Sequence, residues 1–170
     1  VLLGLPSSGL HSNGFSLVRQ ILFKDHDVAL DDRPAELQGA TVGETILTPT
    51  KVYVQAILPL LKDNLINGIS HITGGGLIEN IPRMINDHLK AQIQTDTWPT
   101  LPVFQYLKKL GNLSAEDCWN TFNMGIGLVL AVAPQNVATV QARLQDANQS
   151  SYQIGQLVER PQDEEKIVLQ

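Results

Sequence analysis

The chain has 170 residues, of which 43% are hydrophobic and 17% charged, and its 12 basic and 17 acidic side chains give a formal net charge of −5. A chain of this length buries roughly 70% of the surface that it exposes when unfolded, which suffices for one core and argues against two independent domains. The acidic balance excludes a general binder of nucleic acid or of anionic membranes, since both partners require a basic surface.

The single cysteine, Cys118, excludes an internal disulfide and a zinc site of paired cysteines, so we expect a cytoplasmic location. The longest apolar stretch, residues 126–133, is far shorter than the ~20 residues of a membrane-spanning helix. The chain opens with Val1 inside an apolar run, without an initiator methionine or a secretion signal. We therefore expect it to be one part of a longer protein.

The start of the chain predicts a strand, a loop and a helix. Residues 1–5 are an apolar run typical of a buried strand, and residues 7–14 are small, polar and rich in glycine. Residues 15–22 then have the apolar spacing of an amphipathic helix. The polar stretch 25–45 is expected to be an irregular surface excursion.

A second helix is expected after residue 48. Thr48 or Thr50 would cap it, and Pro59 is expected to kink or break it near Leu58. The residues expected on its apolar face are Val52, Ala56 and Leu60.

The middle of the chain is also predicted to alternate strands with helices. Residues 69–73 and 90–94 alternate apolar and polar side chains, as half-buried strands do, and three glycines end the first of them. Residues 77–85 and 102–110 are expected to be helical.

The last third of the chain contains the segment predicted to be the most buried strand. Ser114 with Asp117 resembles a capping box that opens a helix. Residues 124–133 are the most apolar strand, and residues 135–147 are a polar helix with Val137 and Val140 facing inward. Two late strands are expected at residues 152–158 and 167–169. The whole pattern predicts an α+β or α/β fold, a mixed β-sheet covered by helices.

The loop from Ser7 to Gly14 is the first candidate site. A strand, a Ser/Gly/Asn loop and a helix start present free backbone N–H groups, which suit a phosphate or a carboxylate. His11 in this loop has a side chain that titrates near neutral pH. The alternative is that Ser12 or Asn13 only caps the helix and that His11 is exposed to solvent.

The second candidate is the segment from His71 to Asn80. His71 and Thr73 would share one face of a strand, and the three glycines that follow let a ligand approach the backbone closely. Glu79 serves the helix dipole, a ligand amine or a metal, and the sequence leaves these open.

A third candidate lies at residues 121–127, where Asn123 precedes Gly125 and Gly127. The two glycines would share one strand face, and close packing is favoured over ligand binding as their role. Outside these candidates, His26 and His88 are expected at the surface and Cys118 in the core. The sequence contains no P-loop, dinucleotide fingerprint, HExxH or GxSxG motif.

Four ordered segments resemble one enzyme family. They are GLPSSGLHSNGFSLVR (4–19), LTPTKVYV (47–54), HITGGGLIENIPR (71–83) and TFNMGIG (121–127). Together they resemble the C-terminal half of the phosphoribosylformylglycinamidine cyclo-ligase (aminoimidazole ribonucleotide synthetase) family, over essentially the whole chain. Selenophosphate synthetases, hydrogenase-maturation proteins and thiamine-phosphate kinases share the architecture but are less similar in these segments.

The resemblance implies an ATP-dependent ring closure in purine biosynthesis. Formylglycinamidine ribonucleotide and ATP would give aminoimidazole ribonucleotide, ADP and phosphate, with magnesium. In the family's usual mechanism the formyl oxygen is phosphorylated and an amidine nitrogen then expels phosphate.

The resemblance also implies site residues by position. His71 and His11 would transfer protons or contact phosphate. The residues that would bind substrate or phosphate are Ser7, Ser8, Ser12, Asn13, Gly14, Thr73, Gly74, Gly75 and Gly76, with Glu79, Asn80, Arg83 and Asn123 in support.

The family's N-terminal half would supply most ATP and magnesium contacts and the main interface of a homodimer. We therefore expect residues 1–170 to be a single C-terminal domain that holds no metal itself and is inactive when separated from that half. Two alternatives stay open: a non-catalytic module that binds a phosphorylated metabolite, and a related ATP-dependent small-molecule kinase.

Overall fold

A six-stranded sheet organises the molecule. The computed structural model describes residues 1–170. The strands are β1 (Leu2–Pro6), β2 (Gly68–His71), β3 (Leu89–Ile93), β4 (Ile126–Ala131), β5 (Tyr152–Glu159) and β6 (Ile167–Leu169). Their order across the sheet is β2-β4-β1-β5-β3-β6, and every neighbouring pair is antiparallel except β3 and β6.

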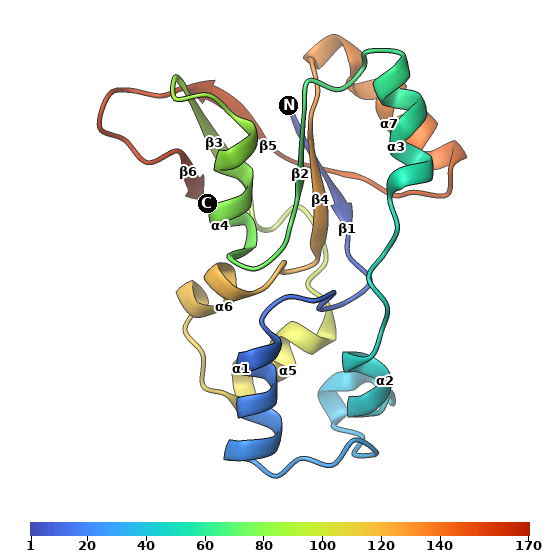
Figure 1. Cartoon of the computed structure of the whole chain (residues 1–170), viewed down its shortest axis with the longest axis vertical. Helices are drawn as coiled ribbons and strands as arrows, with labels where there is room; N and C mark the ends of the chain where they lie inside the picture. The colour runs from blue at the N-terminus through green and yellow to red at the C-terminus, as the bar shows by residue number, and fades with distance from the viewer.

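The apolar composition of β4 explains its central place. Each residue from Ile126 to Ala131 is buried, as expected for a strand covered on both faces. Because β4 is antiparallel to both β1 and β2, the beginning of β4 meets the ends of those two strands. In Figure 1 this meeting point lies at mid-height, above α6 and α1. The predicted mixed sheet with helices is confirmed.

Seven short helices surround the sheet. They are α1 (Phe15–Arg19), α2 (Val42–Ile46), α3 (Val54–Lys62), α4 (Gly76–Asn80), α5 (Pro102–Leu110), α6 (Ala115–Thr121) and α7 (Val137–Asp146). A π-helical turn (Gln20–Asp25) extends α1, and 3-10 turns cover Ala35–Leu37, Ile81–Met84 and Pro134–Asn136. No helix has both the length and the apolar composition that crossing a bilayer requires.

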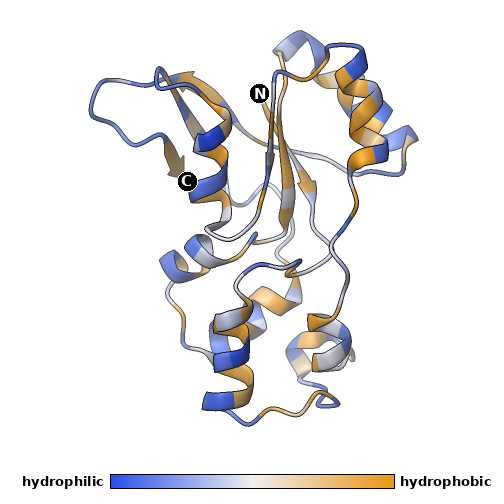
Figure 2. Ribbon diagram, in the orientation of Figure 1, coloured by the Kyte–Doolittle hydropathy of each residue, from blue (hydrophilic) through white to orange (hydrophobic).

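Alternating residues of the central strands pack into two apolar layers, one on each face of the sheet. Leu3 and Leu130 pack with α3 and α7, whereas Leu2 and Val129 pack with α4 and the turn after it. Figures 1 and 2 show α3 and α7 on one side of the strands and α4 on the other, with apolar colour along the strands between them.

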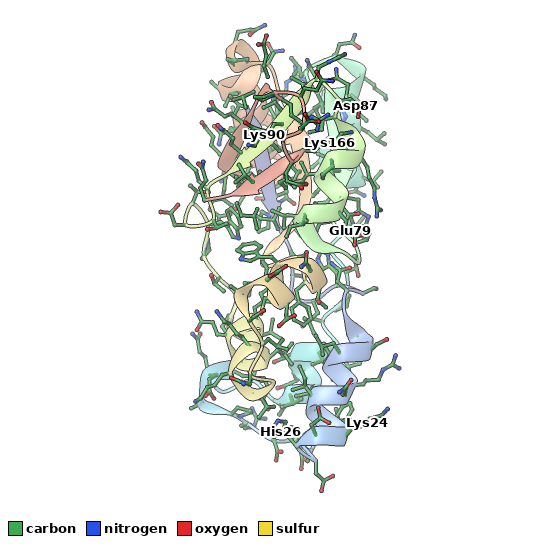
Figure 3. All side chains as sticks on the ribbon, turned by 90° about the vertical axis from the view of Figure 1, so that its left-hand side faces the viewer. Lys24, His26, Glu79, Asp87, Lys90 and Lys166 are labelled. Carbon is green, nitrogen blue, oxygen red and sulfur yellow. The ribbon has the colours of Figure 1, made fainter.

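A third apolar cluster lies below the sheet. Val18, Phe104 and Phe122 bring α1, α5 and α6 together there. In Figure 3 this helical half occupies the lower part of the molecule, with Lys24 and His26 at its end. The predicted surface positions of His26 and His88 and the buried position of Cys118 are confirmed.

The sequence identified several elements correctly. The helix expected at residues 102–110 is α5, and Ser114 with Asp117 forms the expected capping box of α6. The helix expected at 77–85 is divided, because α4 ends at Asn80 and a 3-10 turn containing Pro82 follows. The charged residues before β6 form a turn, held by ion pairs from Lys90 to Glu164 and from Lys166 to Asp87 (Figure 3).

The stretch 25–45 was wrongly expected to be irregular throughout. Helix α2 begins in it, capped by Thr41 and Glu44 in a reciprocal capping box. Leu37 and Val42 from this stretch are buried in the cluster below the sheet.

The prediction for the helix after residue 48 was wrong at its start, and the helix is not broken at Pro59. Helix α3 begins only at Val54, because the Thr48 hydroxyl donates to the carbonyl of Glu44 at the end of α2 instead of capping α3. Val52 therefore lies outside the helix and is 78% exposed. Helix α3 runs through Pro59 without a break, since buried Ile57 and Leu60 hold it against the sheet.

The strand expected at 124–133 is shorter than predicted. Gly125 has a φ of +101° and precedes β4, so Gly125 and Gly127 do not share a strand face. Their surroundings differ too: Gly125 packs against Trp98, whereas Gly127 packs against Tyr53 and His11.

Candidate functional site

Asn123 holds the first loop, which we define as residues 7–14. This side chain is 0% exposed and forms four hydrogen bonds. Its Oδ1 accepts from the Ser7 hydroxyl at 3.0 Å and from the Gly125 amide at 2.9 Å, and its Nδ2 donates to the carbonyls of Gly9 and Leu10 at 2.9 and 3.2 Å. Ser7 and Asn123 therefore act inside the protein, as supports of the loop.

Asn13 joins the first loop to the second candidate segment. Its side chain is 3% exposed, and its Nδ2 donates to the carbonyl of Ile72 at 3.2 Å. Ile72 directly follows β2, so this bond brings together two segments almost sixty residues apart in the sequence. The two candidate segments therefore lie side by side.

Asn80 shapes the glycine turn, which we define as residues 73–76. Its Nδ2 donates to the carbonyls of Thr73, Gly74 and Gly76, and its Oδ1 accepts from the Thr73 hydroxyl. Asn80 itself is 4% exposed. Thr73 and Gly74 are both exposed residues.

Gly76 and Gly14 pack closely against the end of α6, and their binding of a ligand stays a prediction. A Cβ on Gly76 would lie 2.1 Å from the carbonyl oxygen of Trp119, and one on Gly14 would lie 2.6 Å from the Thr121 side chain. Both glycines have positive φ and abut the end of α6. At Gly75 a Cβ would meet the Glu79 side chain, whereas Gly74 has open space around it.

The two histidines have different surroundings. His71 is exposed, but His11 is only 5% exposed, so the alternative of a solvent-exposed His11 is wrong. Nε2 of His11 accepts from the backbone amides of Ser8 at 3.1 Å and of Lys51 at 3.4 Å. Burial, followed by the positive charges of His71 and Lys51, lowers the pKa of His11 to about 4. His11 is therefore neutral at neutral pH.

Tyr53 lies between the two histidines. Its ring centroid is 6.3 Å from that of His11 and 6.5 Å from that of His71, and its hydroxyl donates to the carbonyl of Pro6 at 2.9 Å. Burial raises the pKa of Tyr53, so the phenol stays protonated and remains a donor. Sequence reasoning assigned no role to Tyr53, although it lies in the segment LTPTKVYV that carried part of the resemblance.

Three open hollows surround this centre. One of about 350 Å³ between α3 and β2 is mostly apolar and has Lys51 and His71 in its wall. A second, of about 290 Å³, is lined by His71, Thr73 and Arg83 among others. The third, of about 440 Å³, lies between the first loop and residues 46–50. These volumes suit small ligands.

The charged support residues pair with one another. Arg83 donates to the Glu79 carboxylate at 3.2 Å, and both side chains are mostly exposed; Figure 3 shows Glu79 at the surface of α4. No three His, Cys, Asp or Glu side chains lie together as metal ligands require.

The fold of this chain is shared by solved structures of other proteins. A thiamine-monophosphate kinase from Stenotrophomonas maltophilia K279a has the same fold, with a TM-score of 0.61 and 13% identity over 99% of this chain and 49% of its own. A T. maritima PurL structure complexed with FGAR superposes with a TM-score of 0.52 and 15% identity, over 94% of this chain and 24% of its own. At these identities the likeness concerns the fold alone.

Residues 1–168 match the family model described as "AIR synthase related protein, C-terminal domain", and the chain belongs to that family. It is 63% identical to the phosphoribosylformylglycinamidine cyclo-ligase of Limosilactobacillus fermentum and 66% identical to that of Limosilactobacillus reuteri, over 99% of this chain. The chain spans about half the length of these curated relatives, 49% in both cases.

Proposed function

We propose that this chain is the C-terminal, substrate-side half of an ATP-dependent cyclo-ligase that converts formylglycinamidine ribonucleotide to aminoimidazole ribonucleotide. The observation that carries the proposal is the 63% identity to a cyclo-ligase over 99% of this chain. The hydrogen bond from Asn13 to Ile72 supports it, because it unites the two loops that most resemble that family.

The reaction requires groups that bind phosphate oxygens and handle protons near a nitrogen nucleophile. On this chain, the surface groups suited to substrate are the side chains of Ser8, Ser12 and His71 and the exposed backbone of Thr73 and Gly74. His71 is the proposed proton-transfer group, because its imidazole is the one open to solvent.

Binding of ATP and magnesium would require the family's N-terminal half. ATP, the phosphoryl donor, and magnesium would be held mainly by an N-terminal half, as the resemblance to the cyclo-ligase family implies. We propose that the complete protein is a cytoplasmic homodimer of such two-half subunits, and that this chain has no catalytic activity alone.

A chimeric enzyme tests the proposed function. The matching 49% of the Limosilactobacillus fermentum cyclo-ligase is replaced by this chain, and ADP formation that depends on formylglycinamidine ribonucleotide is measured. The chimera should turn over, the chain alone should not, and His71→Ala should reduce kcat by about 100-fold, within the range of general acid–base catalysis. His88→Ala, at an exposed site in a distant turn, is the matched control.

The alternatives give different results. A folded chimera without turnover, combined with ribonucleotide binding by the chain, would favour a non-catalytic module. Phosphorylation of a small molecule without ring closure would favour a kinase. Cyclisation by the chain alone would contradict the proposed need for a second half.

A further inference from the structure

The hydrogen bonds of His11 define which of its nitrogens carries the proton. Nε2 accepts from the amides of Ser8 and Lys51, so it has no hydrogen of its own. A neutral imidazole that accepts through Nε2 carries its hydrogen on Nδ1. His11 is thus a hydrogen-bond donor through Nδ1 only.

This donor has no acceptor within the chain. Nδ1 of His11 is the one buried side-chain nitrogen or oxygen that lacks a hydrogen-bond partner. Buried donors without partners are rare, because losing water without gaining an acceptor costs free energy. The backbone of His11 adds a second cost, since its φ of +55° lies in the left-handed region that non-glycine residues avoid.

The ring has no room to turn away. A Cβ on Gly127 would lie 2.5 Å from Cε1 of His11 and 2.1 Å from the hydroxyl of Tyr53, so both rings lie directly on the glycine backbone. The amides of Ser8 and Lys51 hold the opposite nitrogen. The surrounding residues therefore fix the imidazole in one orientation with Nδ1–H unused.

His11 lines the third hollow, the one of about 440 Å³, and the other residues there favour an anion. Arg19 supplies a positive charge, and hydroxyl groups come from Ser12 and Thr50, whereas the Thr48 hydroxyl already donates to Glu44. No aspartate or glutamate lines it. Neutral N–H and O–H donors beside one cation are the groups that bind phosphate oxygens in proteins.

We propose that His11 donates its Nδ1–H to a phosphate oxygen of the substrates bound in this hollow, and that His11 itself transfers no proton during the reaction. This inference rests on the proposed function for the identity of the phosphate. The phosphate is either that of the ribonucleotide or the one transferred from ATP, and the kinetic constants below distinguish them.

Two amide substitutions distinguish the roles of the two ring nitrogens of His11. In His11→Asn the side-chain NH2 occupies the covalent position of Nδ1, so the donor is kept and the acceptor for Ser8 and Lys51 is lost. In His11→Gln the terminal amide reaches the position of Nε2, so the acceptor is kept and the Nδ1 donor is lost.

Activity and stability should therefore rank these variants in opposite orders. In the chimera, His11→Gln should lower kcat/KM by about 10- to 100-fold, the effect of one hydrogen bond to a charged group, and His11→Asn should lower it at least about fivefold less. Thermal unfolding should instead place His11→Asn below His11→Gln. A rise in KM for the ribonucleotide would identify the ribose phosphate, whereas a fall in kcat at unchanged KM would identify the transferred one.

Two results would overturn the inference. One is an equal loss of activity in both variants, or activity that follows stability, because a proton carrier or a purely structural histidine gives these patterns. The other is a ¹⁵N spectrum of histidine-labelled protein in which Nε2 of His11 carries the hydrogen, with His11→Asn used to assign the signals.

A phosphate titration keeps this inference separate from the proposed function. Inorganic phosphate added to the labelled chimera should shift the Nδ1 signal of His11 whether or not the chimera turns over. An unmoved signal at saturating phosphate would refute the donor role. An inactive chimera whose Nδ1 signal moves would refute only the cyclo-ligase assignment.

Discussion

Replacing Asn123 by alanine should destabilise the protein more than any exposed substitution. The change removes four hydrogen bonds at a fully buried position, with Ser7, Gly9, Leu10 and Gly125 as the partners. A buried hydrogen bond contributes about 1 kcal/mol net, and each partner left unpaired adds to the loss, so we expect about 4 kcal/mol. For a chain of 170 residues this corresponds to a fall in Tm of roughly 8–16 °C.

Urea unfolding of the chain measures this loss directly, and two further variants calibrate it. Ser7→Ala removes one of the four bonds and should cost about 1 kcal/mol. Asn120→Ala, at an exposed position of α6, should stay within about 0.5 kcal/mol of the unsubstituted protein. A loss below about 1 kcal/mol for Asn123→Ala, or equal losses for Asn123→Ala and Ser7→Ala, would refute the view that Asn123 holds the first loop.

Gly76→Ala should cost about 2–4 kcal/mol, since its Cβ would meet a carbonyl oxygen at 2.1 Å, whereas Gly74→Ala should be neutral; denaturant unfolding that ranks them equally would contradict this. Tyr53→Phe should cost about 1 kcal/mol through loss of the bond to Pro6, and an unchanged Tm would contradict it. The pKa of His11 is about 6.5 in the unfolded chain and about 4 in the folded chain. Protonation of His11 therefore favours the unfolded chain, and the free energy of unfolding should fall by about 2–3 kcal/mol as the pH falls from about 6.5 to about 4. His11→Gln should flatten that part of the curve of unfolding free energy against pH, and an unaltered slope would contradict the assignment.

The elements that sequence predicts well are those with a local physical cause. Helix α5 has Pro102 in its first turn and regular apolar spacing, and α6 has the capping box of Ser114. Strand β4 follows from unbroken apolar composition. Each of these signals is contained in about ten neighbouring residues.

The predictions that failed depend on distant contacts. Thr48 or Thr50 was expected to cap the helix, but the Thr48 hydroxyl donates to Glu44, and the carbonyl of its neighbour Pro49 accepts from Ser8. Only α2 could have been found locally, because Thr41 and Glu44 form the usual capping-box pattern. In the same way, the spacing of the glycines gave no sign that Gly76 packs against α6.

The residues of the candidate site stay a prediction, but the structure shows which of them are buried and which are exposed. Of the residues expected to bind substrate or support the site, Ser7, Asn13, Asn80 and Asn123 are buried and bonded to backbone or to one another. A sequence pattern does not separate such supports from ligand contacts, because both are small polar residues in loops.

The difference between buried supports and exposed groups changes how a loss of activity should be interpreted. Substitution of a buried asparagine releases a loop and lowers the amount of folded protein, so its effect on rate falls with added stabilisation or lower temperature. Substitution of an exposed group such as His71 should leave stability near that of the unsubstituted protein, and under the proposed function it should change the rate alone. His11 combines the two cases, because one ring nitrogen holds the backbone of Ser8 and Lys51 and the other has no partner in the chain. Stability and kcat/KM must therefore be measured on the same preparation, since the two nitrogens of His11 affect different quantities.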